Sequence, residues 1–154
     1  MINRIGKIHR LLVEYQFYPL LLSSALAIGL WAGRSWLWAP RNLRFLVWNL
    51  FLAWLPLIFA LLARERYRTG ARRDWRFAGL AGAWLLFFPN APYIFTDFIH
   101  LIYGPHRHFW VDLTLVLICA LTGFVLGFVS LYLMQSVVRR MYGQIASWVF
   151  IAVV

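Results

Sequence analysis

The sequence predicts an all-α fold: a polytopic helical membrane bundle with four full transmembrane helices and a partial or truncated fifth. Three observations predict it. Of the 154 residues, 63% are hydrophobic and 13% are charged, whereas a soluble domain has roughly 45–50% apolar and 25% charged residues. The apolar residues fall in runs close to the roughly 20 residues that a spanning helix needs. Aromatic residues form 19% of the chain and include nine Trp, which fits aromatic belts at two membrane interfaces.

The expected spans form a single integral membrane domain over residues 1–154, and they cover residues 17–33, 45–63, 77–95, 113–134 and 145–154. Glu14 and Arg34 bound the first span, and Arg64 ends the second. The third contains Pro89, which lacks the N–H that a helix interior needs, so a break is expected there. The last run rises only about 15 Å, half a bilayer. Either the chain is truncated after Val154, or this run is a partial helix packed against the others.

Lys and Arg are distributed unequally between the two ends of these spans. The N-terminal segment, the loop of residues 64–76 and the segment after the fourth span carry eleven, and the opposite side carries four: Arg34, Arg41, Arg44 and Arg107. Because cytoplasmic loops are enriched in Lys and Arg, the N-terminus and the 64–76 loop are expected in the cytoplasm. The chain is then a multi-pass protein of the inner (plasma) membrane, with the His106–His108 loop on the extracytoplasmic side.

The net charge of +10 has the same explanation. Basic residues lie between apolar runs, where they set topology and contact anionic lipids. The expected partner is therefore the bilayer, with anionic lipid contact through the cytoplasmic arginines. No basic segment is interleaved with polar residues that read bases, so no nucleic-acid partner is expected. Homo-oligomerisation and assembly into a larger membrane complex are both left open.

A polar cluster follows the break in the third span. Polar groups at membrane depth are costly, so they mark either a working site or a structural lock. The candidate site residues are Asn49, Asn90, Tyr93, Thr96, Asp97 and His100. Four of them are spaced by three, four and three residues, which places them on one helix face: Asn90, Tyr93, Asp97 and His100. We expect these four to form one hydrogen-bonded unit, with Asn49 as a partner from the second span.

Two interpretations of the break stay open. In one, Asn90 caps a new half-helix that presents its N-terminus to a substrate. In the other, the break is a static kink whose free carbonyls are satisfied by neighbouring side chains, and Asn49 bonds the carbonyls that Pro89 frees.

The sequence predicts no cofactor. Metal binding is a secondary hypothesis. Zinc or a related divalent ion could use the histidines and carboxylates gathered on the outer side, which are Asp97, His100, His106, His108 and Asp112. No zinc motif of standard spacing accompanies them. The alternative is that Asp112 caps the fourth helix and that Thr96 or Asp97 caps a short interfacial one.

Small residues predict how two spans pack. Gly123 and Gly127 are four residues apart in the fourth span, which allows close approach of another helix. Gly79 and Gly82 give the third span a similar face. We expect the third and fourth spans to pack through these glycines, with homodimerisation as the alternative.

The most distinctive motifs are Pro-Asn-Ala-Pro-Tyr at residues 89–93 and Thr-Asp-x-x-His at residues 96–100. With Asn49–Pro56 and Trp110–Asp112, they make roughly residues 41–133 resemble a family of bacterial multi-pass membrane proteins, the domain-of-unknown-function family 1361. The resemblance implies a helical membrane fold and a candidate site, with no established activity. Members tend to be longer than this chain, which fits truncation after Val154.

Three classes of function are consistent with these observations. A non-enzymatic structural or accessory membrane component is favoured, because a polar cluster without a full catalytic constellation is weak evidence for chemistry. One alternative is a small-molecule transporter or binder that uses the broken third helix. The other is a membrane enzyme at the outer face, with Asp97 and His100 as acid and base.

Overall fold

The computed structural model describes residues 17–37, 43–68, 74–102 and 108–154. Every regular element in these residues is helical, which confirms the predicted fold class. Four helical stretches are long and apolar enough to cross a membrane: Phe17–Leu37, Arg44–Arg68, Trp75–Phe98 and Phe109–Tyr142. A shorter apolar helix, Gln144–Val153, follows them. The chain is therefore a multi-pass membrane protein.

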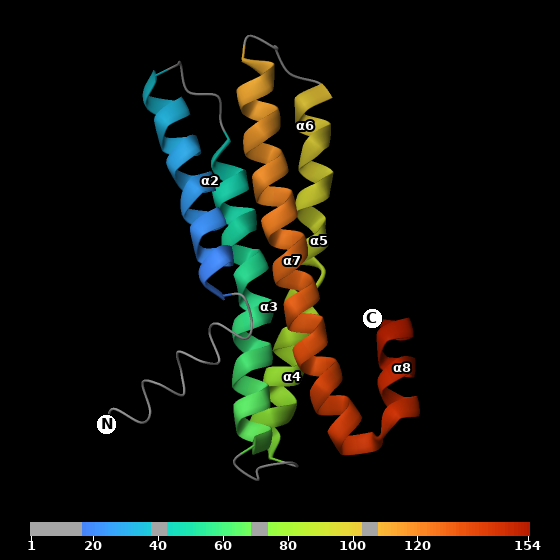
Figure 1. Cartoon of the computed structure of the whole chain (residues 1–154). Coiled ribbons are helices and arrows are strands. Elements are labelled where there is room, and N and C mark those ends of the chain that lie inside the picture. The colour runs from blue at the N-terminus through green and yellow to red at the C-terminus, as the bar shows by residue number, and fades with distance from the viewer. Residues whose placement is uncertain (1–16, 38–42, 69–73, 103–107) are drawn as a thin grey trace, which may run out of the picture.

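The first two spans are single helices, α2 (Phe17–Leu37) and α3 (Arg44–Arg68). The third is divided into α4 (Trp75–Phe87), α5 (Asn90–Tyr93), the 3₁₀ helix η1 (Ile94–Phe98) and α6 (Ile99–Ile102). The fourth is α7 (Phe109–Tyr142), and α8 (Gln144–Val153) comes after it. The long helices run side by side along one axis, and consecutive spans run in opposite directions (Figure 1).

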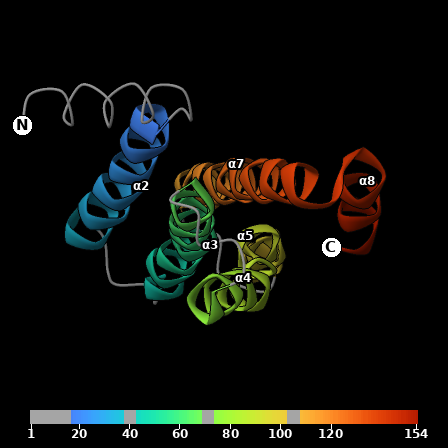
Figure 2. The same ribbon diagram turned by 90° about the horizontal axis from the view of Figure 1, so that it is seen from below.

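Helix α7 is the central element of the bundle. It contacts α2, α3, α5, η1, α6 and α8, whereas α4 packs chiefly on α3. In the view from below, α3 and the third span lie on one side of α7, whereas α2 lies near one end of it and α8 at the other (Figure 2). The packing of the third span on α7 is therefore made by the part after the break.

The buried face of α3 explains its place beside α7. Its fully buried apolar residues recur with alternating spacings of four and three: Leu46, Leu50, Ala53, Leu57 and Ala60. Such a repeat makes a narrow stripe, which suits helices that pack at a small crossing angle. Large apolar side chains on the outer faces, such as Leu22 and Phe51, are exposed. In a bilayer these faces contact lipid at no cost.

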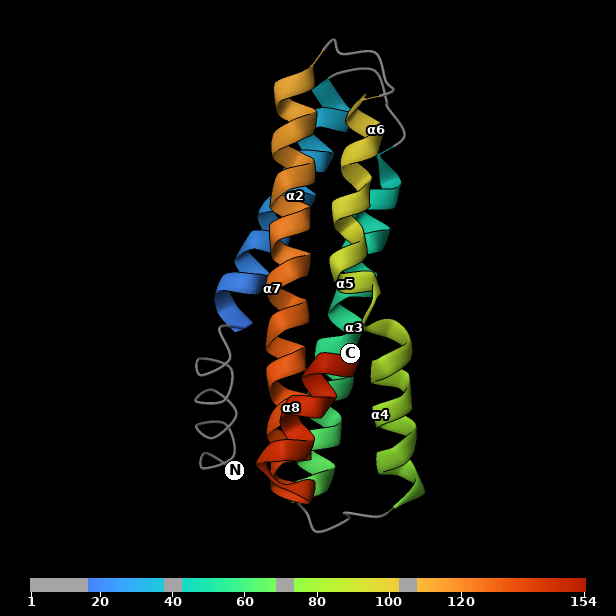
Figure 3. The same cartoon turned by 90° about the vertical axis from the view of Figure 1, so that its right-hand side faces the viewer.

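Helix α8 is a partial helix that packs against the bundle. The chain reverses direction at Gly143, whose φ of 91° is a conformation that other residues rarely adopt. Phe150 of α8 then meets Trp84 of α4, with ring centroids 5.6 Å apart. The Trp84 indole also donates a hydrogen bond to the Ser130 hydroxyl of α7, at 3.3 Å. Figure 3 shows α8 folded back over the lower part of α7.

Candidate functional site

Two carbonyls at the break in the third span accept hydrogen bonds from nearby groups. Helix α4 ends at Phe87, and the carbonyl of this residue accepts a hydrogen bond from the Asn90 side-chain amide at 3.1 Å. The carbonyl of Phe88 accepts from the backbone N–H of Ala91, also at 3.1 Å. The prediction that Asn90 caps the second half-helix is wrong. Asn90 is already the first residue of α5, and its side chain reaches back across the break instead of forward.

After the break the helical period changes, and this changes which residues are buried. Ala91, Ile94 and Asp97 are buried at intervals of three residues, as expected when the chain passes into a 3₁₀ helix with three residues per turn. Tyr93, predicted on the same face as Asp97, is 58% exposed. Tyr93 therefore does not share the buried face of Asp97, contrary to the prediction from a uniform α-helical period.

Two further candidate residues lie beside Asp97 in the sequence. Thr96 lies inside η1 and is exposed, and its hydroxyl donates to the carbonyl of Tyr93 at 2.7 Å. His100 lies in α6, and its side chain is outside the part of the chain that the structure describes.

Asp97 and Asn49 form one interhelical contact in the half of the bundle away from the arginine-rich end. The Asn49 Nδ2 donates to the Asp97 Oδ2 at 2.9 Å, which joins α3 to η1. Asp97 is only 3% exposed. Asn49 was expected to bond either the polar residues of the third span or the carbonyls freed by Pro89. In the structure it bonds Asp97.

Arg34 and Asp112 form the second contact, which joins α2 to α7. The Arg34 Nε donates to Asp112 Oδ1, and Nη2 donates to Oδ2 at 3.1 Å, so the guanidinium holds the carboxylate in a bidentate pair. The two side chains are 5% and 2% exposed. Within the described residues, Nη1 of Arg34 has no hydrogen-bond partner. This ion pair was missed by sequence reasoning.

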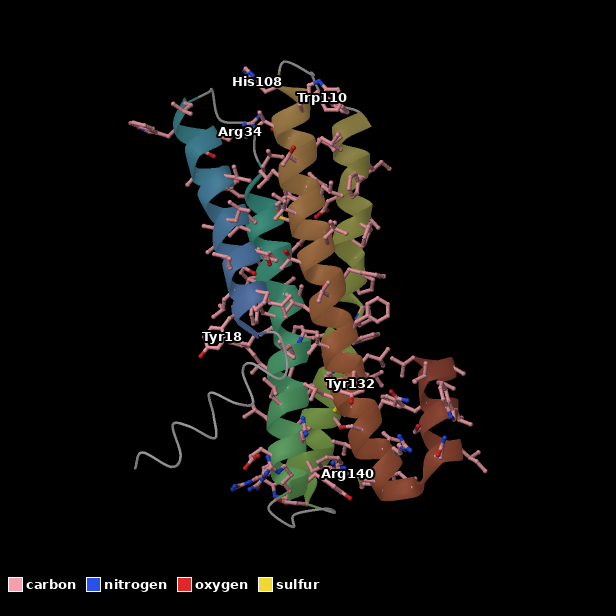
Figure 4. The ribbon with its side chains drawn as sticks, in the orientation of Figure 1. Tyr18, Arg34, His108, Trp110, Tyr132 and Arg140 are labelled. Atoms are coloured by element: carbon pink, nitrogen blue, oxygen red, sulfur yellow. The ribbon has the colours of Figure 1, made fainter. Side chains whose placement is uncertain are left out.

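The prediction that Asp112 caps α7 is wrong, because His108 occupies the N-cap position and Asp112 lies inside the first turn. Arg34, His108 and Trp110 lie at the same end of the bundle, opposite Arg140 (Figure 4). One signal in the sequence could have found the ion pair: Arg34 ends the first span and Asp112 begins the fourth, and these two positions meet at one membrane face.

The candidate metal ligands do not converge within the described chain. The two carboxylates face different partners, Asp97 with Asn49 and Asp112 with Arg34. No group of three His, Cys, Asp or Glu side chains that could hold a metal ion occurs among the residues that the structure describes. His106 and the side chain of His100 lie outside the part of the chain that the structure describes.

The glycines of the fourth span mark a close helix contact. A Cβ placed on Gly123 would lie 2.6 Å from Ile94 Cδ1 and 3.0 Å from the Ala91 carbonyl oxygen. A Cβ on Gly127 would lie 3.0 Å from Ala91 Cβ. The third and fourth spans thus pack through this face of α7, against α5 and η1.

Gly79 and Gly82 do not supply the matching face, and that part of the prediction is wrong. A Cβ added to either residue would meet nothing within 4 Å. The physical reason is the break: α4 packs on α3, while the contact with α7 is made by the residues that follow Pro89.

A comparison with known families decides the identity of the chain. The sequence profile of the family described as Protein of unknown function (DUF1361) matches residues 48–154. The chain belongs to the DUF1361 family. This confirms the resemblance seen in the sequence and extends it through α8. The matched DUF1361 region includes Asn49, Asp97 and Asp112, whereas Arg34 precedes it. No curated protein and no solved structure matches the chain.

Proposed function

We propose that this DUF1361 protein is a non-enzymatic structural or accessory component of the membrane, in which the polar groups of the spans hold helices together. One observation carries the proposal: buried and partly buried polar side chains pair across helices. The pairs are Arg34–Asp112, Asn49–Asp97, Trp54–Ser24, Thr122–Ser23 and Trp84–Ser130. Pairing of this kind removes the cost of an isolated polar group near lipid.

The geometry gives less support to the two alternatives. A catalytic or binding centre needs several polar groups that converge on a space where a reacting atom or ligand can lie. Here the Asp97 carboxylate faces Asn49, while Tyr93 and Thr96 are exposed. A transporter would use the free backbone groups of the broken helix. At this break the carbonyls of Phe87 and Phe88 already accept hydrogen bonds.

Variants of Asp97 test this proposal. In Asp97→Asn, the amide oxygen can still accept the Asn49 hydrogen bond, so stability should fall by about 1 kcal/mol or less. In Asp97→Leu, the Asn49 amide loses its acceptor, and the loss should be about 1–3 kcal/mol. Unfolding in mixed detergent micelles measures both values.

The same variants distinguish a structural role of Asp97 from a chemical one when each is expressed in a deletion strain. A structural role predicts that Asp97→Asn restores whatever phenotype the deletion causes. A variant that folds and accumulates normally but restores nothing would show that the carboxylate itself is needed, which favours the transporter or the enzyme.

We also infer that the protein lies in the inner membrane with the arginine-rich end in the cytoplasm. The described arginines of that end are Arg64, Arg66, Arg68, Arg76, Arg139 and Arg140. A single cysteine at His106, introduced as His106→Cys, should react with an impermeant thiol reagent applied from outside. Arg140→Cys is the control and should react only after permeabilisation. Native Cys119 is buried and should give little background. The opposite labelling pattern would reverse the orientation.

A further inference from the structure

A groove lies between the last turns of α3 and the first turns of α4, at the arginine-rich end of the bundle. Its volume is about 510 Å³. Leu62, Gly79 and Leu80 give it an apolar floor. Because a Cβ on Gly79 would meet nothing within 4 Å, the groove stays open along this glycine. In the bilayer an open apolar groove on the outer surface of a bundle is accessible to lipid chains.

The rim of the groove carries excess positive charge. Glu65 pairs with Arg68 at 3.6 Å, and Arg66 pairs with Asp74 at 2.8 Å. Arg76 is exposed, and its guanidinium lies 5.5 Å from the centre of the Trp75 ring. It makes no ion pair with any carboxylate in the described part of the chain. Among the described residues that line the groove, Arg76 is therefore the cation that is left for a ligand.

We propose that this groove binds an anionic glycerophospholipid, with one acyl chain along Leu62, Gly79 and Leu80 and the phosphate at Arg76. Three properties of the groove match that ligand. It is a basic pocket between two transmembrane helices, which suits an anionic head group. The Arg76 guanidinium suits the phosphate. Trp75 is 77% exposed, as is typical of an aromatic residue at the level of lipid head groups. This assigns a ligand site that the proposed structural role does not require.

Lipid retention tests the charge at the rim. The full chain is reconstituted in bilayers of equal amounts of phosphatidylglycerol and phosphatidylcholine, and the lipids that remain bound after mild extraction are counted by native mass spectrometry. Arg76→Gln should weaken phosphatidylglycerol retention by about fivefold, the effect of one interfacial cation. Arg140→Gln removes an exposed arginine at the same end, on α7, and should change nothing. Equal losses in both variants would mean diffuse attraction and would overturn the site.

Filling the groove tests the acyl chain. Gly79→Phe should abolish the bound phosphatidylglycerol, while Gly82→Phe, which also has open space around it, should retain it. Retention in Gly79→Phe would overturn the groove as the site. Glycerol phosphate added in excess should not displace the lipid. Displacement would show that a soluble phosphate ester is the ligand, and the lipid proposal would then be wrong.

Discussion

Replacing Asp112 with Leu should lower the free energy of unfolding by about 3–5 kcal/mol, because it leaves a buried guanidinium without its counter-charge. Arg34 is 5% exposed, and its Nε and Nη2 both donate to Asp112. The variant also removes the contact between the end of α2 and the start of α7. Unfolding by sodium dodecyl sulfate in mixed micelles, followed by circular dichroism, measures the change.

The Arg34→Met/Asp112→Leu double variant should recover most of this loss. Replacing both members of a buried ion pair by apolar residues is often neutral, since no charge is then left uncompensated. Glu65→Gln is the control: it breaks the exposed Arg68 pair, and should change stability by less than about 1 kcal/mol. A double variant as unstable as Asp112→Leu would contradict this account of the pair.

Gly123→Leu should lower the free energy of unfolding by about 3 kcal/mol, the upper part of the usual range for overpacking. The first added carbon would lie 2.6 Å from Ile94 Cδ1 and 3.0 Å from the Ala91 carbonyl oxygen. The Ile94 side chain can turn aside, but the backbone oxygen moves only if α5 moves. The same micelle unfolding measures the loss.

Gly82→Leu is the matched control for this variant. It introduces the same side chain into the same kind of apolar helix, yet it has no atom within 4 Å of its Cβ position. We expect little change in its unfolding. Similar losses in Gly82→Leu and Gly123→Leu would show that the effect comes from the added side chain in lipid, and that the α7–α5 contact is not the cause.

The fold was predictable because its main determinants are local. Apolar runs predict spans, and Pro89 predicts the break in the third. The helix ends were less predictable. Helix α7 covers Phe109–Tyr142 where the apolar pattern indicated residues 113–134, since a helix continues into the polar residues beyond the hydrocarbon layer. Nothing in hydropathy marks where such an extension stops.

The candidate site was predictable only in part. Asn49 and Asp97 were identified as polar groups that need partners, and they bond each other. Tyr93, a predicted companion of Asp97, lies elsewhere because residues 94–98 form a 3₁₀ helix, in which residues three apart share a face. Arg34 was interpreted as the boundary of a span. Its partner is 78 residues away, and no local spacing reveals a pairing of that kind.

The most direct test of the structural role is whether the Arg34→Met/Asp112→Leu double variant restores the phenotype of a deletion strain. The comparison should be made at equal abundance in the membrane, with the Asp112→Leu single variant beside it. If the ion pair holds α2 to α7 and does nothing else, the double variant restores the phenotype and the single variant, which unfolds, does not. A double variant that is folded and abundant yet restores nothing would contradict the account, because the charges themselves would then be needed.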